Sequence, residues 1–399
     1  MRLLFVADGR SPTALNWIEY FLDRDNQVHL VSTFACAADP RLASFQVVPV
    51  AFSSVKSAPG GPKSRAGKVL GLLGTPAIGL RTRLRHWLGP LTLPKAAQCL
   101  RTVIEAVQPD LVHAMRIPYE GMLAALAGAE APLVISVWGN DFTLHAPSTP
   151  LMARYTRLAL KRAAALHADC QRDLRLGRDW GFPEDKPAVV LPGAGGVQAE
   201  LFYPPEIGNA EGADNGNCLD RTRRVINPRG FRAYVRNDTF FKAIPLVLAR
   251  RPETRFVCPV MAEEPQARRW VDELGIQANV DLLPRQTRPQ MAALFRSAQV
   301  AVSPTTHDGT PNTLLEAMAC GCFPVAGDLE SLREWIIPGV NGLLVDPADP
   351  QALAQGILQG LEDENLDQGA RAYNLRLIAE RAAYELVMEQ AQEFYRQII

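Results

Sequence analysis

The sequence lacks a net charge, a long apolar run and a cysteine framework, and each absence excludes a class of protein. Its 42 basic residues balance its 42 acidic residues over 399 positions, so no global positive field favours nucleic acid as a partner. No apolar run reaches the roughly 20 residues that a membrane-spanning helix needs. The first residues, MRLLFVADG, have neither the apolar core nor the cleavage site of a signal peptide. We therefore expect a cytoplasmic protein, either free or peripheral at the inner face of the membrane.

The cysteines are few and scattered. None of the seven belongs to a CxxC pair or stands at metal-ligand spacing from histidines; they are Cys36, Cys99, Cys170, Cys218, Cys258, Cys320 and Cys322. This pattern is typical of a reduced intracellular protein without disulfides or a zinc site. Cys320 and Cys322 flank one glycine where a helix meets a strand, and we expect both to be buried. The sequence shows no cluster of carboxylates for a divalent ion either, so we expect neither a metal nor a cofactor.

What the sequence has is an alternation of short apolar and amphipathic segments. A hydrophobic content of 47% with 21% charged residues is that of a folded protein, and 399 residues suffice for two domains. Continuous apolar runs suit strands that are buried on both faces of a parallel sheet. In the first half we predict strands at 2–8, 27–33, 45–52, 110–115, 133–139, 165–169 and 188–193, and helices at 13–23, 95–107, 119–128 and 150–164.

A segment rich in Pro, Gly, Asn and Asp, residues 201–222, interrupts the alternation and is predicted to be a linker. After it we predict strands at 224–228, 255–260, 279–283, 298–303, 323–326 and 342–345, and helices at 238–250, 264–274, 288–297, 313–320, 329–336 and 350–362. The fold class is therefore α/β, with one doubly wound domain over 1–200 and another over 223–370. One or two terminal helices over 371–399 can cross back to the first domain. Two such domains would face each other across a ligand-binding cleft.

The stretch SPTTHDGTPNTLLEAMACGCFPVAG, residues 303–327, places two carboxylates eight residues apart around the start of a helix. A loop there leads from a strand into the helix predicted to end at Gly321. Gly309 allows the backbone to approach a ligand, and Pro311 suits the first helical turn. The first N–H groups of the helix form an anion site with the helix dipole behind them. These groups belong to Asn312, Thr313 and Leu314.

The two carboxylates stand on either side of this anion site. Glu316 lies one turn inside the predicted helix, where it can accept hydrogen bonds from the hydroxyls of a ribose. Asp308 lies on the loop, where it can accept bonds from a second hydroxylated ring. A phosphate site between two polyols outlines a nucleotide sugar. The alternative for Asp308 is that it only caps the turn, as Asp often does.

The stretch resembles the nucleotide-sugar signature of the retaining glycosyltransferases with the GT-B fold, glycosyltransferase family 4. The resemblance implies that Asp308 contacts the donor sugar, that Glu316 contacts the ribose, and that the backbone from Gly309 through Thr310 to Leu314 contacts the diphosphate. The segments DLVHAM, PLVISVWGNDF, VVLPGAGGVQAELFYP and EWIIPGVNGLLVDPADPQALAQGI are similar to other parts of the family. Asp141 matches the aspartate of the family's GSD turn and is therefore a candidate catalytic residue.

The sequence also departs from the family's pattern. Where the family carries Arg and Lys for the diphosphate, this chain reads NPRGFRAYVRNDTFFKAI, in which Arg229, Arg232 and Arg236 are the available cations. Arginine clamps phosphate bidentately, so the function can be kept; three solvated surface arginines are the alternative. Trp138 stands where many members have a histidine, and His113 is expected to be a core or cleft-wall residue rather than a base. Gly9, in the first loop, can face the donor phosphates, although one glycine is a weak signal.

Residues 51–104 contain no Asp or Glu but nine Lys or Arg residues, interleaved with apolar ones. Such a basic, amphipathic segment can lie on an anionic membrane surface. It can equally cover the acceptor site without contacting lipid, and both alternatives stay open.

The resemblance implies a metal-independent enzyme that transfers a sugar from a nucleoside-diphosphate donor with retention. Its acceptor would be a carbohydrate or a lipid-linked glycan. Arg229, Arg236 and the helix start would stabilise the leaving diphosphate. A glycoside hydrolase also uses two carboxylates, but it does not need an anion site between them. The remaining rivals are a nucleotide-sugar epimerase of the same shape and a non-catalytic sugar-nucleotide or glycan-binding protein.

Overall fold

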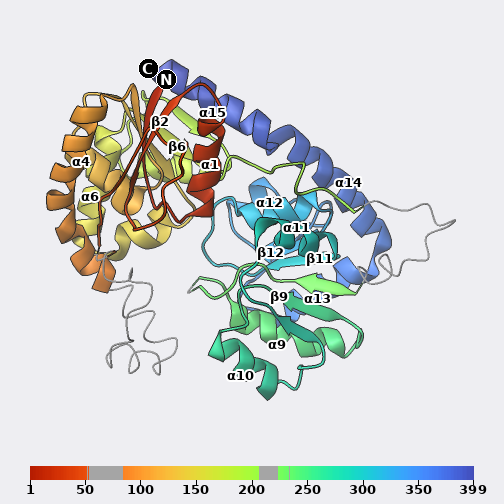
Figure 1. The fold of residues 1–399 in the computed structure, drawn as a ribbon. Helices are drawn as coiled ribbons and strands as arrows, with labels where there is room; N and C mark the ends of the chain where they lie inside the picture. The colour runs from red at the N-terminus through yellow and green to blue at the C-terminus, as the bar shows by residue number, and fades with distance from the viewer. Residues whose placement is uncertain (52, 54–83, 206–222, 233) are drawn as a thin grey trace. The chain divides into compact units, whose positions relative to one another are not determined.

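The computed structural model describes residues 1–51, 53, 84–205, 223–232 and 234–399 (Figure 1). The chain forms two compact units, each described here by itself. The first comprises Met1–Gly195 together with Val387–Ile399, and the second comprises Gly196–Leu386. The end of the last helix therefore belongs to the N-terminal unit. The predicted linker lies mostly outside the described residues, at 206–222.

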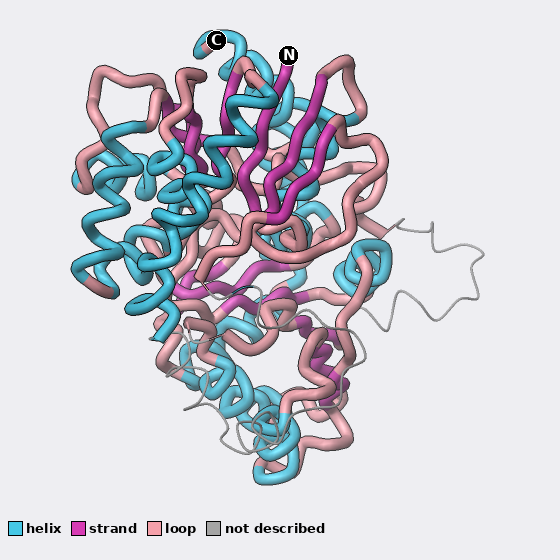
Figure 2. The backbone as a smooth tube through the Cα atoms, turned by 60° about the vertical axis from the view of Figure 1, so that its left-hand side comes forward, coloured by secondary structure: helices cyan, strands magenta, loops and turns pink. Residues whose placement is uncertain are grey.

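The first domain is built on a parallel sheet with the strand order β3-β2-β1-β4-β5-β6-β7. Its strands are β1 (Arg2–Ala7), β2 (Gln27–Ser32), β3 (Ser44–Val47), β4 (Leu111–Ala114), β5 (Leu133–Val137), β6 (Ala165–Ala168) and β7 (Ala188–Val190). Its helices are α1 (Pro12–Leu22), α4 (Leu93–Val107), α5 (Met122–Ala127), α6 (Pro150–Arg162), α7 (Gln171–Asp179) and most of α15 (Tyr384–Ile398). The central strands β1, β4 and β5 are almost entirely buried and mostly apolar because helices cover both faces of the sheet (Figure 2).

The two faces of the first sheet have different cores. Leu4 and Val6 of β1 pack with α4, α5 and α6 in one apolar cluster. On the other face, Phe5 lies beside Phe21 of α1, which stacks on Tyr395 of α15 with ring centroids 5.0 Å apart. Successive side chains of β1 point to opposite faces of the sheet, and both faces are buried. The sequence of this strand therefore shows no alternation of apolar and polar residues.

A buried polar network joins α15 to the strands. The Tyr395 hydroxyl accepts a hydrogen bond from Trp17 Nε1 at 2.9 Å and also contacts His113 Nδ1. His113 Nε2 and His167 Nδ1 each lie 2.8 Å from the Ser136 hydroxyl. Burial lowers the pKa of both histidines, that of His167 to about 4, so they stay neutral. The prediction that His113 is a core residue is confirmed, because its side chain is fully engaged and buried.

The second domain contains a parallel sheet with the order β10-β9-β8-β11-β12-β13. Its strands are β8 (Arg224–Ile226), β9 (Arg255–Cys258), β10 (Val280–Leu282), β11 (Val300–Ser303), β12 (Phe323–Gly327) and β13 (Leu343–Val345). Its helices are α9 (Asn237–Leu248), α10 (Pro265–Glu273), α11 (Arg288–Arg296), α12 (Asn312–Ala319), α13 (Pro350–Glu362) and α14 (Glu364–Arg381). Two apolar clusters cover its faces, one with α9 and α13 and the other with α11 and α12. Both domains thus have the predicted doubly wound α/β architecture.

Four predicted elements were wrong in extent, and one of them is the strand predicted at 188–193, which ends at Val190. The strand predicted at 45–52 ends at Val47, shortly before Pro49, which cannot donate to a ladder. The helix predicted at 119–128 begins only at Met122, because Pro118 and Tyr119 have non-helical backbone angles. The helix predicted at 329–336 is a single 3₁₀ turn, Leu332–Glu334. There the carbonyl of Trp335 accepts a hydrogen bond from Asn341 Nδ2, at 2.8 Å.

Helix α12 ends as the sequence predicts. Gly321 has a positive φ of 76°, and Cys322 N donates to the Ala317 carbonyl at 2.9 Å. This αL termination is the usual role of a glycine after a helix. Cys320 and Cys322 are both buried beside it, as expected. Within the described part of the chain, no helix is long and apolar enough to cross a bilayer.

Candidate functional site

The candidate site of the second domain lies between β8 and β11, where the order of the strands in the parallel sheet reverses. Loops that leave the carboxyl ends of these two strands flank the position where doubly wound sheets bind ligands. The two loops are hydrogen-bonded to each other. Arg236 N donates to the Pro304 carbonyl and Thr306 N donates to the Tyr234 carbonyl, both at 2.9 Å. The residues that follow β8 and those that precede α12 therefore form one structural unit.

Arg229 and Asp308 form the centre of this unit. The Arg229 guanidinium makes an ion pair with the Asp308 carboxylate, and its Nη1 lies 3.4 Å from the Thr313 hydroxyl in the first turn of α12. Only 12% of the Arg229 side chain and 15% of the Asp308 side chain are exposed. A guanidinium held in front of a helix start adds a full positive charge to the partial charge of the helix dipole. The arrangement suits a phosphate group.

The loop that carries Arg229 is fixed by two buried asparagines. Asn227 Oδ1 accepts from Arg229 N at 3.2 Å, and Asn237 Nδ2 donates to the Gly230 carbonyl at 2.9 Å. Asn227 and Asn237 also bond to each other at 3.2 Å. Gly230 takes a positive φ of 61°, which glycine adopts without strain. The arginine therefore sits on a rigid turn.

The loop before α12 is held from the other side. Ser331 Oγ donates to the Asp308 carbonyl at 2.7 Å, and Trp335 Nε1 donates to the Thr310 hydroxyl at 3.0 Å. Gly309, Thr310 and Pro311 are buried beneath these contacts. Pro311 is the N-cap of α12 and offers no side-chain hydrogen bond to the first turn, in which Asn312 and Thr313 are half-buried. Leu314 N, one of the three N–H groups predicted to bind an anion, donates to the Pro311 carbonyl at 2.9 Å, so the anion site at this helix start rests on Asn312 and Thr313.

Glu316 lies one turn into α12, with 16% of its side chain exposed. Burial raises the pKa of its carboxyl group to about 7, and the Arg288 guanidinium opposes that rise. Arg288 Nη2 lies 4.0 Å from Glu316 Oε1, so the ion pair is a loose one. A carboxylate kept in such a place without a close partner is unfavourable unless a ligand donates to it.

The other predicted cations are not gathered around Asp308. Arg236 binds Asp238 bidentately, at 2.8 and 2.7 Å, and this ion pair raises the arginine's pKa. Arg232 is exposed. Of the three arginines that the sequence offered, the structure brings only Arg229 together with the carboxylate and the helix start.

The first domain holds the two remaining predicted site residues. Asp141 is buried, with its carboxylate 2.8 Å from Arg116 Nε and accepting from Trp138 N at 3.2 Å. Burial raises the pKa of this carboxyl group. Gly9 packs so closely on Ser32 and Cys36 that a Cβ would lie 2.5 Å from the Cys36 sulfur. Both residues hold the loops at the carboxyl ends of β5 and β1 in place.

Sequence reasoning missed several residues that the fold brings together. Arg288 begins α11, after β10, on the same sheet edge as α12, and that shared edge was the available signal. Asp169, Cys170 and Asp173 stand within five consecutive residues, and their ligand atoms come within 4.8 Å of one another in the first domain. Burial and the neighbouring Asp173 raise the pKa of Asp169 well above its usual range. This group belongs to the domain that does not carry Asp308.

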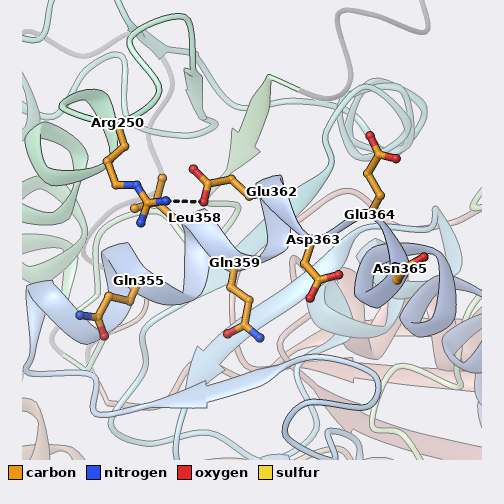
Figure 3. A pocket seen from close by; sticks show the side chains of 8 residues that line it. All are labelled: Arg250, Gln355, Leu358, Gln359, Glu362, Asp363, Glu364 and Asn365. Atoms are coloured by element: carbon orange, nitrogen blue, oxygen red, sulfur yellow. Dashed lines mark hydrogen bonds and ion pairs between the residues drawn. The ribbon is translucent and has the colours of Figure 1, made fainter.

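A pocket of about 590 Å³ lies elsewhere in the second domain, along α13 and the start of α14 (Figure 3). Its wall includes the ion pair of Arg250 with Glu362, whose N–O distance is 2.7 Å. None of the residues that line it belongs to the predicted site. Its open, mixed lining offers no convergent set of groups for chemistry.

Comparisons with known proteins agree with this geometry. Residues 230–363 match the family model described as glycosyl transferases group 1, and residues 13–193 match the glycosyl transferase 4-like domain. The chain is 32% identical over 220 residues to a D-inositol 3-phosphate glycosyltransferase of Corynebacterium urealyticum. That alignment covers 53% of this chain and 51% of the relative. A protein of the same name from Thermobispora bispora is 30% identical over 136 residues, 32% of each chain. The matches thus span about half or less of these relatives' length.

Solved structures share the fold over the whole chain. Sucrose-phosphate synthase of Thermosynechococcus elongatus superposes with a TM-score of 0.73 at 16% identity, covering 100% of this chain and 99% of that one. Anabaena HepE, solved in complex with UDP, gives 0.71 at 16% identity with full coverage of both chains. At this identity the likeness concerns the fold alone. Because one family model matches each domain and the fold agrees throughout, the chain belongs to the group 1 glycosyltransferases, glycosyltransferase family 4, with two Rossmann-like domains.

Proposed function

We propose that the protein transfers a sugar from a nucleoside-diphosphate sugar to an acceptor, with retention at the anomeric carbon. The observation that carries the proposal is the contact of Arg229 with both Asp308 and Thr313 at the start of α12. It puts a fixed cation, a helix dipole and a carboxylate at the ligand-binding edge of one sheet. Membership of the family supports the same reaction.

In the proposed mechanism, the diphosphate binds to Arg229 and to the first N–H groups of α12. Negative charge develops on the leaving diphosphate as the glycosidic bond breaks, and these groups are already oriented to stabilise it. Glu316 accepts hydrogen bonds from the ribose, and Asp308 accepts them from hydroxyls of the sugar. Arg236 would join the diphosphate only by leaving Asp238. The proposed reaction needs no metal ion, because a guanidinium supplies the positive charge.

The acceptor is proposed to be a carbohydrate or a lipid-linked glycan. Residues 52 and 54–83 of the basic segment 51–104 lie outside the described part of the chain. The part that follows exposes large apolar side chains, with Leu84 57%, Trp87 60% and Leu91 64% accessible. Exposed apolar groups beside basic residues support contact with an anionic membrane. Cosedimentation with anionic vesicles should weaken in the double variant Trp87→Ser, Leu91→Ser; binding that is absent in both proteins would contradict the membrane contact.

Donor binding is tested by thermal shift with a panel of nucleoside diphosphates and their sugars. A ligand at 100 times its Kd stabilises the folded state by about 2.7 kcal/mol, which gives a clear shift. Donor turnover with and without acceptors then separates the candidate activities. A transferase releases the nucleoside diphosphate only when an acceptor is present, whereas an epimerase converts the nucleotide sugar without any acceptor. For a non-catalytic binding protein, the ligand raises the unfolding temperature but no donor is turned over.

A further inference from the structure

The carboxyl edge of the first sheet carries a cluster of arginines on aromatic rings. The Arg10 guanidinium lies 3.5 Å from the centre of the Phe34 ring. The Arg85 guanidinium lies 4.7 Å from the Tyr119 ring and 5.5 Å from the same Phe34. Arg10, Phe34 and Tyr119 follow β1, β2 and β4, and the order of the strands in this sheet reverses between β1 and β4. The cluster therefore occupies the position where a doubly wound domain binds a ligand.

Arg85 differs from its neighbours in its charge balance. Arg10 is paired with Asp8 at 3.0 Å, and Arg116 is paired with Asp141 at 2.8 Å. Arg85 makes no ion pair with any carboxylate in the described residues, and its Nε is buried there without a hydrogen-bond partner. The preceding residues, 54–83, contain no Asp or Glu and cannot supply one. A half-buried guanidinium with an unsatisfied donor is costly unless an acceptor reaches it.

The groups around Arg85 balance its charge only in part, because Glu120 is partly protonated at neutral pH. Glu120 is buried and accepts a hydrogen bond from Thr33 Oγ1 at 2.6 Å, and burial raises its pKa to about 7. His145 Nδ1 lies 3.0 Å from His86 Nε2. Burial and then Arg116 lower the pKa of His145 to about 2, and burial with Arg85 lowers that of His86. Two neutral imidazoles therefore stand beside two guanidiniums, and they add polar groups but no negative charge.

The backbone holds the ring beneath Arg85 in a strained position. Tyr119 has φ 72° and ψ −55°, which an aromatic residue rarely adopts. Its hydroxyl donates to the Arg85 carbonyl at 3.0 Å. Gly89 packs against the ring so tightly that a Cβ would lie 2.9 Å from it. Strain of this kind persists where the surroundings enforce it, often at ligand sites.

We propose that the first domain binds an anionic group of the acceptor, a phosphate or a carboxylate, through the Arg85 guanidinium with Arg116 and His145 beside it. The inference rests on the proposed transferase function and narrows its acceptor to a charged one. Planar guanidinium groups bind both oxyanions bidentately, and stacking on Tyr119 fixes the orientation of the fork. The neutral His145 can contribute a hydrogen bond to the same anion.

The test uses the full chain saturated with a nucleoside diphosphate, so that added anions cannot occupy the donor site. Inorganic phosphate is titrated while the Arg85 Nε–Hε signal is followed by NMR, assigned from its loss in Arg85→Gln. We expect a saturable shift in the wild-type protein. Phosphate affinity, measured for every variant by calorimetry, should fall about tenfold to a hundredfold in Arg85→Gln, as for a lost charged hydrogen bond, and less in Arg85→Lys. Arg157→Gln is the matched control, because Arg157 also stacks on an aromatic ring, Trp180, at 4.9 Å.

Further probes distinguish the source of the anion. Glucose 6-phosphate, glucuronate and glucose separate a phosphate from a carboxylate and from a neutral sugar, and vesicles containing phosphatidic acid separate a lipid headgroup from a soluble phosphate. A protein that binds the diphosphate but shows no saturable anion shift at Arg85 would overturn this inference alone. Equal phosphate affinity in Arg85→Gln and wild type would do the same. Failure to bind any nucleoside diphosphate would instead overturn the proposed function.

Discussion

Replacing Glu316 by glutamine should make the ligand-free protein more stable while it weakens nucleotide binding. The pKa of this carboxyl is raised by burial from an ordinary 4.5 to about 7. The folded protein therefore binds the proton more tightly than the unfolded chain does. No stability is lost below pH 4.5; stability falls as the pH rises from 4.5 through 7, and the loss is complete above that. A rise of this size corresponds to about 3 kcal/mol.

A glutamine side chain cannot ionise, so Glu316→Gln should remove this loss. At pH 8 the variant should unfold at higher urea concentration than the wild type, by up to about 3 kcal/mol in the free energy of unfolding. At pH 4 the two proteins should be nearly equal. Glu273→Gln is a suitable control, because Glu273 is exposed at the end of α10. It should change stability little at either pH.

Nucleotide affinity supplies the second half of this prediction. In the proposed site, ribose hydroxyls donate to the ionised form of Glu316. At a pKa of about 7 this form makes up about a tenth of the molecules at pH 6 and about nine-tenths at pH 8. Calorimetry should therefore show that the wild type binds the nucleotide about tenfold more weakly at pH 6 than at pH 8. The same two titrations of Glu316→Gln correct for any pH dependence that comes from other groups. If Glu316→Gln is no more stable at pH 8 and binds the nucleotide as tightly as wild type, the reasoning about Glu316 is wrong.

Four further variants test other parts of the account. Asp308→Asn should lower turnover more than nucleotide affinity, because Asp308 is proposed to contact the sugar; equal losses in both would show that the roles are wrongly divided. Arg229→Ala should lower the turnover number by about 100- to 1,000-fold, as for the loss of one oxyanion donor, and Arg236→Ala should lower it less, since Arg236 is held by Asp238. A larger loss of turnover in Arg236→Ala than in Arg229→Ala would show that Arg236 is the main cation for the diphosphate. Tyr395→Phe should cost about 1–3 kcal/mol of stability by leaving buried donors unpaired, and an unchanged urea midpoint would contradict the network assigned to its hydroxyl.

Much of the fold could be predicted because its signals are local. Strands such as β1 are uninterrupted apolar runs, and helix α12 carries its own stop signal in Gly321. The loop with Asp308 could be placed for the same reason, since its strand, turn and helix are consecutive in the sequence. Two of the element ends that were wrong have a proline beside them, Pro49 and Pro118, and another involves a contact outside its own segment. The bond from Asn341 to the Trp335 carbonyl is one such contact, which no local pattern shows.

The choice among the arginines could not be made from the sequence. Arg236 stands in the family's lysine place, yet its guanidinium binds Asp238, two residues on, whereas Arg229 reaches Asp308 from 79 positions away. In the sequence, Arg85 belongs to the basic segment 51–104, which can lie on a membrane or cover the acceptor site. The fold instead stacks it on Tyr119, from another element. Sequence position shows which cations are available, but the partner of each is decided by the folded chain.

The most direct test of the central claim is release of the nucleoside diphosphate from a matched sugar donor, with and without acceptor, followed by NMR of the anomeric proton of the product. The account predicts acceptor-dependent release, a product with the donor's anomeric configuration, and loss of both in Arg229→Ala. Release that ignores the acceptor, or a product of inverted configuration, would contradict it.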